Sequence, residues 1–141
     1  MPSGLDNAEA TRLVNAMLGL TAYTASQLPI NVRLVTSIPT ATTNGSELSG
    51  NVRVPFVAAS GANPASPSPT AATNGAITNS VSAITFPNLT AGEVVGVELW
   101  DSNGTPRRKM YGTLAANKTV AAGDSLVFAT SALTASLLTT P

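Results

Sequence analysis

The segment 98–114, ELWDSNGTPRRKMYGTL, holds the densest group of side chains in this sequence that could bind or react. It contains three of the seven basic residues, two of the seven acidic residues, the only Trp and one of the two Tyr: Arg107, Arg108, Lys109, Glu98, Asp101, Trp100 and Tyr111. Exposed Trp, Tyr and Arg together are typical of the centre of a protein-binding surface. The same side chains could instead pair with one another across two neighbouring strands.

Enzymatic chemistry is not expected from these residues. The chain has no His and no Cys, which excludes Ser–His and Cys–His nucleophile systems and most zinc sites. A string that begins at Asp101 resembles the start of a calcium loop, but Gly112 stands where that loop requires a glutamate. We therefore expect no catalytic residue, metal, cofactor or small-molecule substrate.

The charge balance excludes further classes of partner. Seven basic and seven acidic residues give a net charge of zero, so no long-range field would collect nucleic acid or an anionic membrane. The sequence shows neither an 18-residue apolar stretch nor the basic and apolar start of a signal peptide. Only 10% of the residues are charged, against about 25% in an ordinary soluble domain. Large core side chains are also few, so we expect a chain that folds as part of an assembly.

The elements that must position segment 98–114 are predicted to be two strands, 93–101 and 108–114. Asn103 and Gly104 are the preferred central pair of a two-residue type I′ hairpin turn. This turn would place Glu98 opposite Lys109 as an ion pair, and Trp100 opposite Arg107 as a cation–π contact. On the core side we expect Val95, Val97, Leu99 and Met110, with Arg108 at the rim. Pairing within the hairpin is the favoured interpretation, and a contact surface is the alternative.

The N-terminal region is predicted to be a helix over residues 5–20. Asp6 followed by Glu9 resembles a capping box, and Gly19 is a plausible stop. One face of this helix is apolar at helical spacing: Ala10, Leu13, Val14, Met17 and Leu18. We favour a helix that packs this face on its own domain, and the alternative is an arm that docks on a neighbouring subunit.

After residue 28 the sequence changes to short alternating strands separated by Gly, Asn and Pro, which is typical of an antiparallel β-sandwich or barrel. The predicted strands are 30–37, 51–57, 83–86, 93–101, 108–114, 118–120, 125–129 and 133–138. Pro55 indicates an edge or a bulge, and Pro106 indicates that 105–114 lies at an edge near its start. We predict one all-β domain, 1–141, with a helix or arm at 1–20, a sandwich at 28–138, and a Pro-rich loop at 60–76 that lies on a neighbour.

Seven short strings of the sequence are distinctive: LGLTAYTA, NGSELSG, ITFPN, VVGVELWDS, YGTL, NKTVAAGDSLVFA and ALTASL. Together they resemble a family of small tailed-bacteriophage virion proteins, known as head decoration or tail fibre proteins. The resemblance runs from Leu18 to Leu138, interrupted at the Pro-rich segment, and KTVAAGDSLVF with the preceding YGTL is its most specific part. It implies a β-sandwich virion component without catalysis, made in the cytoplasm of a bacterial host, and it assigns no ligand residues.

From the composition and pattern of the sequence, together with the family resemblance, we expect a capsid decoration protein on the outside of the virion. Its partners would be the major capsid protein and copies of itself, as a homotrimer, because no fibre-forming repeat is visible. The alternative is a tail-tip or tail-fibre component with a role in binding the host receptor. The candidate interface residues are Leu13, Met17, Trp100, Arg107 and Tyr111.

Overall fold

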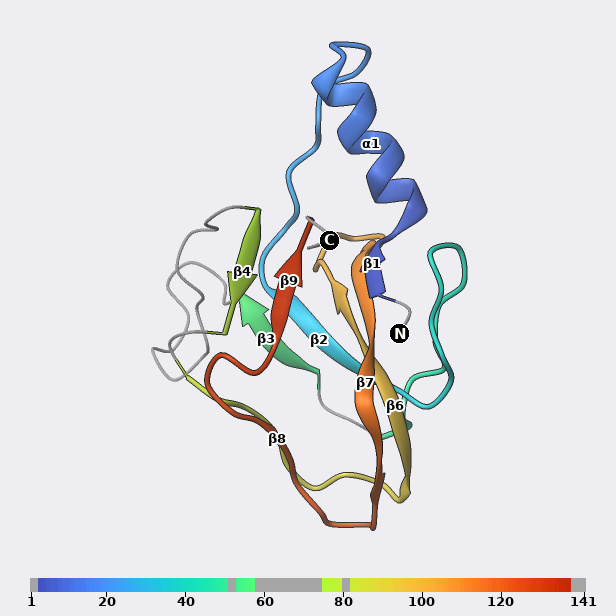
Figure 1. The fold of residues 1–141 in the computed structure, drawn as a ribbon, viewed down its shortest axis with the longest axis vertical. Coiled ribbons are helices and arrows are strands. Elements are labelled where there is room, and N and C mark those ends of the chain that lie inside the picture. The colour runs from blue at the N-terminus through green and yellow to red at the C-terminus, as the bar shows by residue number, and fades with distance from the viewer. Residues whose placement is uncertain (1–2, 51–52, 58–74, 80–81, 138–141) are drawn as a thin grey trace.

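The computed structural model describes residues 3–50, 53–57, 75–79 and 82–137. In chain order the elements are β1 (Ser3–Leu5), α1 (Asn7–Met17), β2 (Ile30–Val35), β3 (Val54–Val57), β4 (Ala76–Thr78), β5 (Ile84–Phe86), β6 (Gly92–Trp100), β7 (Arg108–Val120), β8 (Leu126–Phe128) and β9 (Thr134–Ser136). A five-stranded sheet has the order β1-β7-β6-β2-β3, and β4-β9 and β5-β8 form two small sheets (Figure 1). Every named strand pair is antiparallel. The predicted all-β class with one N-terminal helix is confirmed.

The core lies on one face of the five-stranded sheet. In the pairing of β2 with β6, Val32 lies opposite Leu99 and Leu34 opposite Val97, and all four side chains are buried. The same apolar cluster includes Phe86 of β5, whose ring meets a ring of β8 edge-on. The alternation along β2 and β6 identified Val32, Leu34, Val97 and Leu99 as core-facing side chains correctly. The prediction for Val95 is wrong, because a register shift between Val94 and Gly96 puts Val94 in the core cluster instead. Arg108 does not lie at the rim of the core side either, since it is buried and pairs with Glu98.

Most predicted strands overlap an observed one, and three details differ. The segments 108–114 and 118–120 are one long strand, β7. Two strands of three residues each, β1 and β4, were not predicted, because so short a strand carries almost no alternation. β4 begins at Ala76, the last residue of the predicted loop, and the rest of that loop lies mainly outside the described residues.

The two proline-based predictions agree with the sheet in different degrees. Pro55 lies in β3, an edge strand of the large sheet, as expected. The segment 105–114 was predicted to lie at an edge near its start, and residues 105–108 do lie outside the pairing of β1 with β7, whereas Met110 to Gly112 are covered by β1. Pro106 itself precedes β7, so its missing N–H removes no hydrogen bond from the sheet.

The predicted hairpin turn and register are also wrong. Trp100 lies opposite Arg108, and Glu98 lies opposite Tyr111. The connection is a wide loop over 101–107, closed by hydrogen bonds between the backbone and side chain of Asp101 and the backbone of Arg107. A shift in the ladder next to this loop moves the register further. The local preference of the Asn-Gly pair was thus overridden by the longer-range contacts of Asp101.

Helix α1 is shorter than predicted and projects beyond the sheet (Figure 1). Asp6 caps its first turn, accepting a hydrogen bond from the Ala8 N–H at 2.9 Å. The prediction that its apolar face packs on its own domain is wrong, since Met17 is 84% and Leu18 69% exposed. The reason is the route of the chain: β1 pairs along β7, and the helix then leaves the end of the sheet.

Candidate assembly interface

Most charged side chains lie in two chains of ion pairs that join the base of α1 to the sheet. The first chain runs through six residues, with N–O distances of 2.7, 2.9, 3.6, 3.4 and 2.8 Å: Asp6–Arg108, Arg108–Glu98, Glu98–Arg33, Arg33–Glu47 and Glu47–Arg53. The second joins Glu9 to Lys109, Lys109 to Asp101, and Asp101 to Arg107, at 2.7, 3.2 and 3.2 Å. Arg12 also pairs with Glu9. We call these eleven residues, with the ion pairs between them, the charge clamp.

Glu98 is the centre of the first chain and is fully buried. One of its oxygens, Oε1, accepts hydrogen bonds from the Gly45 N–H at 2.7 Å and from Arg108 at 2.9 Å. The other, Oε2, accepts one from the indole N–H of Trp100 at 2.9 Å. A carboxylate without water requires this degree of pairing, because an unpaired buried charge is strongly destabilising.

The second chain fixes the first turns of the helix. Glu9 is 1% exposed although it lies on the helix, because Lys109 donates to it from the sheet. Arg108, from the first chain, adds a bond to the capping residue Asp6 and donates to the backbone oxygens of Thr40 and Thr43. The base of α1 is therefore held by the sheet on one side and by the loop after β2 on the other.

Two carboxyl groups of the clamp, those of Asp101 and Glu47, are suited to staying ionised. Burial raises the pKa of Asp101, but the backbone N–H of Arg107 and the Lys109 ammonium together lower it further, so the net pKa lies below its ordinary value. The hydrogen bond from Arg53 lowers the pKa of Glu47 against a smaller opposing effect of burial. Such groups hold elements together rather than exchange protons near neutral pH.

The predicted aromatic and basic candidates take part in the clamp. Trp100 is half-buried, with the guanidinium of Arg33 5.3 Å from its ring centre, so the predicted contact with Arg107 is wrong. Tyr111 lies under Arg108 at 5.1 Å. Arg107 reaches Asp101 and the backbone oxygen of Thr24. The predicted ion pair between Glu98 and Lys109 is also wrong. Glu98 pairs with Arg108 and Lys109 pairs with Glu9, in the two separate series of ion pairs. A contact of these residues with a partner stays a prediction.

The outer part of the helix is apolar and uncovered. We call residues 13–20 the α1 tip. Val14, Met17, Leu18 and Leu20 are 52–84% exposed there, and Leu13 is half-buried. No charged residue occurs in this stretch or in the return segment 21–29. The tip is an unpartnered apolar face of the kind that marks a protein contact.

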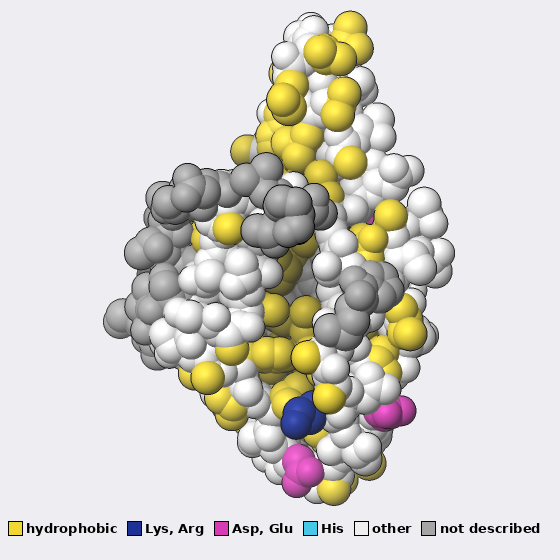
Figure 2. Space-filling view, viewed as in Figure 1, with side chains coloured by type: hydrophobic (Ala, Val, Ile, Leu, Met, Phe, Trp, Pro, Cys, Tyr) yellow, Lys and Arg dark blue, Asp and Glu magenta, His cyan; other side chains and the backbone are white. Residues whose placement is uncertain are grey.

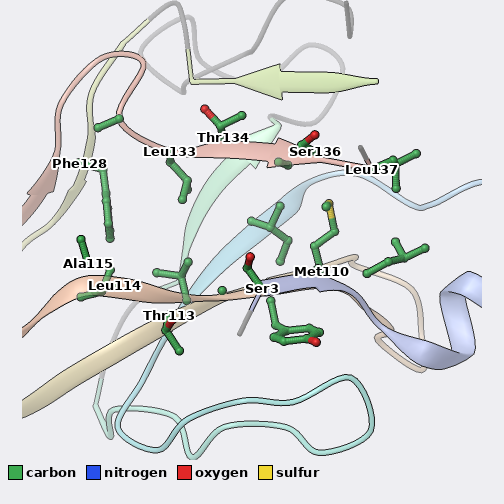
Figure 3. A pocket seen from close by; sticks show the side chains of 18 residues that line it. Ser3, Met110, Thr113, Leu114, Ala115, Phe128, Leu133, Thr134, Ser136 and Leu137 are labelled. Carbon is green, nitrogen blue, oxygen red and sulfur yellow. The ribbon is translucent and has the colours of Figure 1, made fainter. Parts of the chain in front are cut away.

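A second uncharged surface, partly apolar and partly polar, lies beside β1 and β7. A groove of about 740 Å³ runs between these strands and the segment around β9; we call it the β7–β9 groove. Its lining includes Met110 and Leu114 from one side and Phe128 and Leu133 from the other (Figure 3). Space-filling shows hydrophobic side chains along α1 and in the hollow below it (Figure 2). Sequence patterns did not reveal the groove, because it depends on how β9 is placed against β7.

The described residues offer neither a metal site nor a membrane-spanning helix. They contain no group of three or more His, Cys, Asp or Glu that could hold a metal ion. No helix in the described ranges is long and apolar enough to cross a membrane.

Comparison with known proteins supplies the family. No curated protein matches the chain. One family model, described as Podophage GP4 fiber I protein gp80, matches residues 4–136, which is nearly the whole length. The match agrees with the resemblance to phage virion proteins in the sequence strings. It confirms a bacteriophage structural protein, and the chain belongs to this family of phage fibre proteins.

Proposed function

We propose that this chain is a non-enzymatic component of a phage fibre, and that it assembles by burying the α1 tip against another protein. The observation that carries the proposal is the contrast along one helix. Glu9 at the base is 1% exposed and ion-paired, whereas Met17, two turns later, is 84% exposed. A helix whose base is fixed and whose tip is apolar is a preformed attachment element.

The charge clamp gives this element an advantage in binding. Association costs free energy when loops and side chains must be ordered, and an element that is already rigid avoids part of that cost. The ion pairs of Asp6 and Glu9 with Arg108 and Lys109 order α1 before any partner arrives. Binding at the tip then draws mainly on apolar burial, at about 25 cal/mol per Å².

A location in the fibre is the alternative expected from the sequence, and the description of the matching family favours it. Decoration of the capsid remains the second candidate, because the sequence is small, neutral and without a shaft repeat. The number of copies in each particle separates the two. We expect gel densitometry of purified virions to give a handful of copies, whereas hundreds would place the chain on the capsid.

A test of the attachment element uses phage that carry Leu18→Lys. A lysine at this exposed position should leave the fold intact but place a charge in the contact. We expect virions that lack the protein, as measured by quantitative mass spectrometry. The matched control is Thr11→Lys, which adds the same charge at an exposed position nearer the base of the helix. Normal incorporation of the Leu18 variant would contradict the proposal.

A further inference from the structure

We infer that the β7–β9 groove is the binding site for the α1 tip of a second copy of this chain. The inference rests on the proposed structural function and names the partner of the tip. Each copy then carries both halves of one contact: a helix at one end and a groove beside the sheet (Figure 2).

The first argument is electrostatic. None of the residues that line the groove is charged, and neither is any residue of the tip. Burying either surface against a charged partner would leave an ion without water or a counter-ion. The two surfaces, in contrast, can be buried together without desolvating a charge. Apolar side chains at i, i+3, i+4 and i+7 are also how an amphipathic helix binds a groove; Ala10, Leu13, Val14, Met17 and Leu18 follow this spacing.

The second argument is length. The helical part of the tip, residues 13–17, spans about 7.5 Å at 1.5 Å per residue. The groove is lined without a break by residues 110–115 of β7 and by 132–137 around β9. Five steps of about 3.3 Å along an extended strand give about 17 Å on each side. The groove is therefore long enough to hold the helical part of the tip and the residues that follow it.

The third argument is that a chain cannot fill its own groove with its own helix. β1 pairs with β7 and itself lines the groove. The next residue, Asp6, donates its backbone N–H to Lys109 O at 3.0 Å, and Glu9 is bound by the Lys109 ammonium. These contacts hold the first turn at the end of the sheet and direct the helix away from it (Figure 1). The occupant must come from another molecule.

A contact between the tip and the groove joins copies head to tail. Every copy then contributes its tip to one neighbour and its groove to the other. Each chain is therefore held in the assembly by two contacts rather than one.

Engineered cysteines give the decisive test, because the natural chain has none. Purified full-length Met17→Cys is mixed with Ala115→Cys, whose side chain is exposed on the groove wall, and the mixture is oxidised (Figure 3). We expect a disulfide-linked pair between the two variants. The matched controls are Thr11→Cys on the helix and Ala122→Cys, which is exposed outside the groove; each should give at least tenfold less product with the opposite partner.

Light scattering provides a second readout that needs no disulfide. We expect the molar mass of the natural chain to be a multiple of 14.2 kDa. Leu18→Lys and Ala115→Lys should both have the mass of a monomer, and Ala122→Lys should have the same mass as the natural chain. Cross-linking of Met17→Cys with itself but not with Ala115→Cys would overturn the inference in favour of helix-to-helix contact. A monomeric natural chain would overturn it too. The proposed function fails separately, when virions incorporate the Leu18→Lys variant normally.

Discussion

The base and the tip of α1 reverse the usual distribution of side chains between the inside and the surface of a protein. At the base, carboxylates and cations are buried: Glu9, Glu98 and Arg108 are at most 4% exposed. At the tip, Met17 and Leu18 are mostly exposed. Charged residues are normally the least buried and large apolar residues the most. The charged side chains of the base are therefore paired within the chain, whereas the apolar side chains of the tip stay exposed.

The comparison also teaches what the buried charges contribute. Buried ion pairs often add little net stability, because desolvation offsets their attraction. Apolar side chains could have attached the helix to the sheet, but an apolar base would allow it to slide or tilt. Bonds such as Arg108 to Asp6 at 2.7 Å and Lys109 to Glu9 at 2.7 Å have fixed partners. We infer that the clamp sets the direction of the helix.

The largest expected effect comes from breaking the base. Arg108→Met leaves Glu98 and Asp6 without their main cation in a buried site, so we expect the free energy of unfolding to fall by about 3–5 kcal/mol. Urea denaturation measures this loss. Arg53→Ala is the matched control, because it breaks an ion pair at the exposed end of the same chain of contacts and should cost about 0–1 kcal/mol. Equal losses in the two variants would show that the clamp is not fixed by burial.

A smaller effect is expected from acid. The pKa of Asp101 is lowered in the folded state, so its contribution is present above the unfolded pKa of about 3.9 and is lost as the pH falls through the folded value. The free energy of unfolding should be level from about pH 5 to 7, because the chain has no His, and should decrease below about pH 4. Asp101→Asn should cost about 1–3 kcal/mol at pH 7.

The gap between Asp101→Asn and the natural chain should narrow as the pH falls below 4, since protonation removes the same charge that the substitution removes. Denaturation at a series of pH values measures the gap. A gap that stays constant down to pH 2 would mean that the charge of Asp101 contributes nothing to the loop 101–107.

The sequence predicted the apolar core of the sheet better than the positions of the charged side chains. Period-two alternation placed Val97 and Leu99 in the core, because burial of one sheet face is a local signal. The same alternation placed Glu98 on the face away from the core, and the structure buries it there. What covers that face is the loop after β2, which contributes Gly45 and Thr43, and no local pattern shows which loop crosses which sheet.

The helix shows the same limit. Its N-cap, Asp6, and its apolar face were readable from residues 6–18, and both are present. The predicted capping box is wrong for Glu9, because the Asp6 N–H donates to Lys109 O and the Glu9 carboxylate binds the Lys109 ammonium. Its direction was not readable, because it depends on β1 pairing with β7 about a hundred residues away. The β7–β9 groove was missed for the same reason. Periodicity shows which face of an element is apolar, and only the tertiary structure shows whether that face is covered.

Changes at the tip should have little effect on the isolated chain. Leu18 is 69% exposed, so Leu18→Ser should change the free energy of unfolding by about 0.5 kcal/mol or less in dilute protein. Self-association would add a dependence on concentration, because a partner that binds only the folded state stabilises it. We expect the thermal midpoint of the natural chain to rise with protein concentration and that of Leu18→Ser to stay level. If the thermal midpoint of the natural chain does not depend on protein concentration, a second copy is not the partner of the tip.

The smallest expected effect concerns the loop beside the base. A type I′ turn at Asn103-Gly104 would require a left-handed conformation at the glycine, and alanine there would cost about 1–2 kcal/mol. In the structure the φ angle of Gly104 lies outside that region, and an added Cβ would meet no atom within 4 Å. We therefore expect Gly104→Ala to change the free energy of unfolding by only a few tenths of a kcal/mol. Urea denaturation beside Asp101→Asn gives the comparison. A larger loss of stability from Gly104→Ala than from Asp101→Asn would indicate that the tight turn does form. It would also contradict the role of Asp101 in closing the loop.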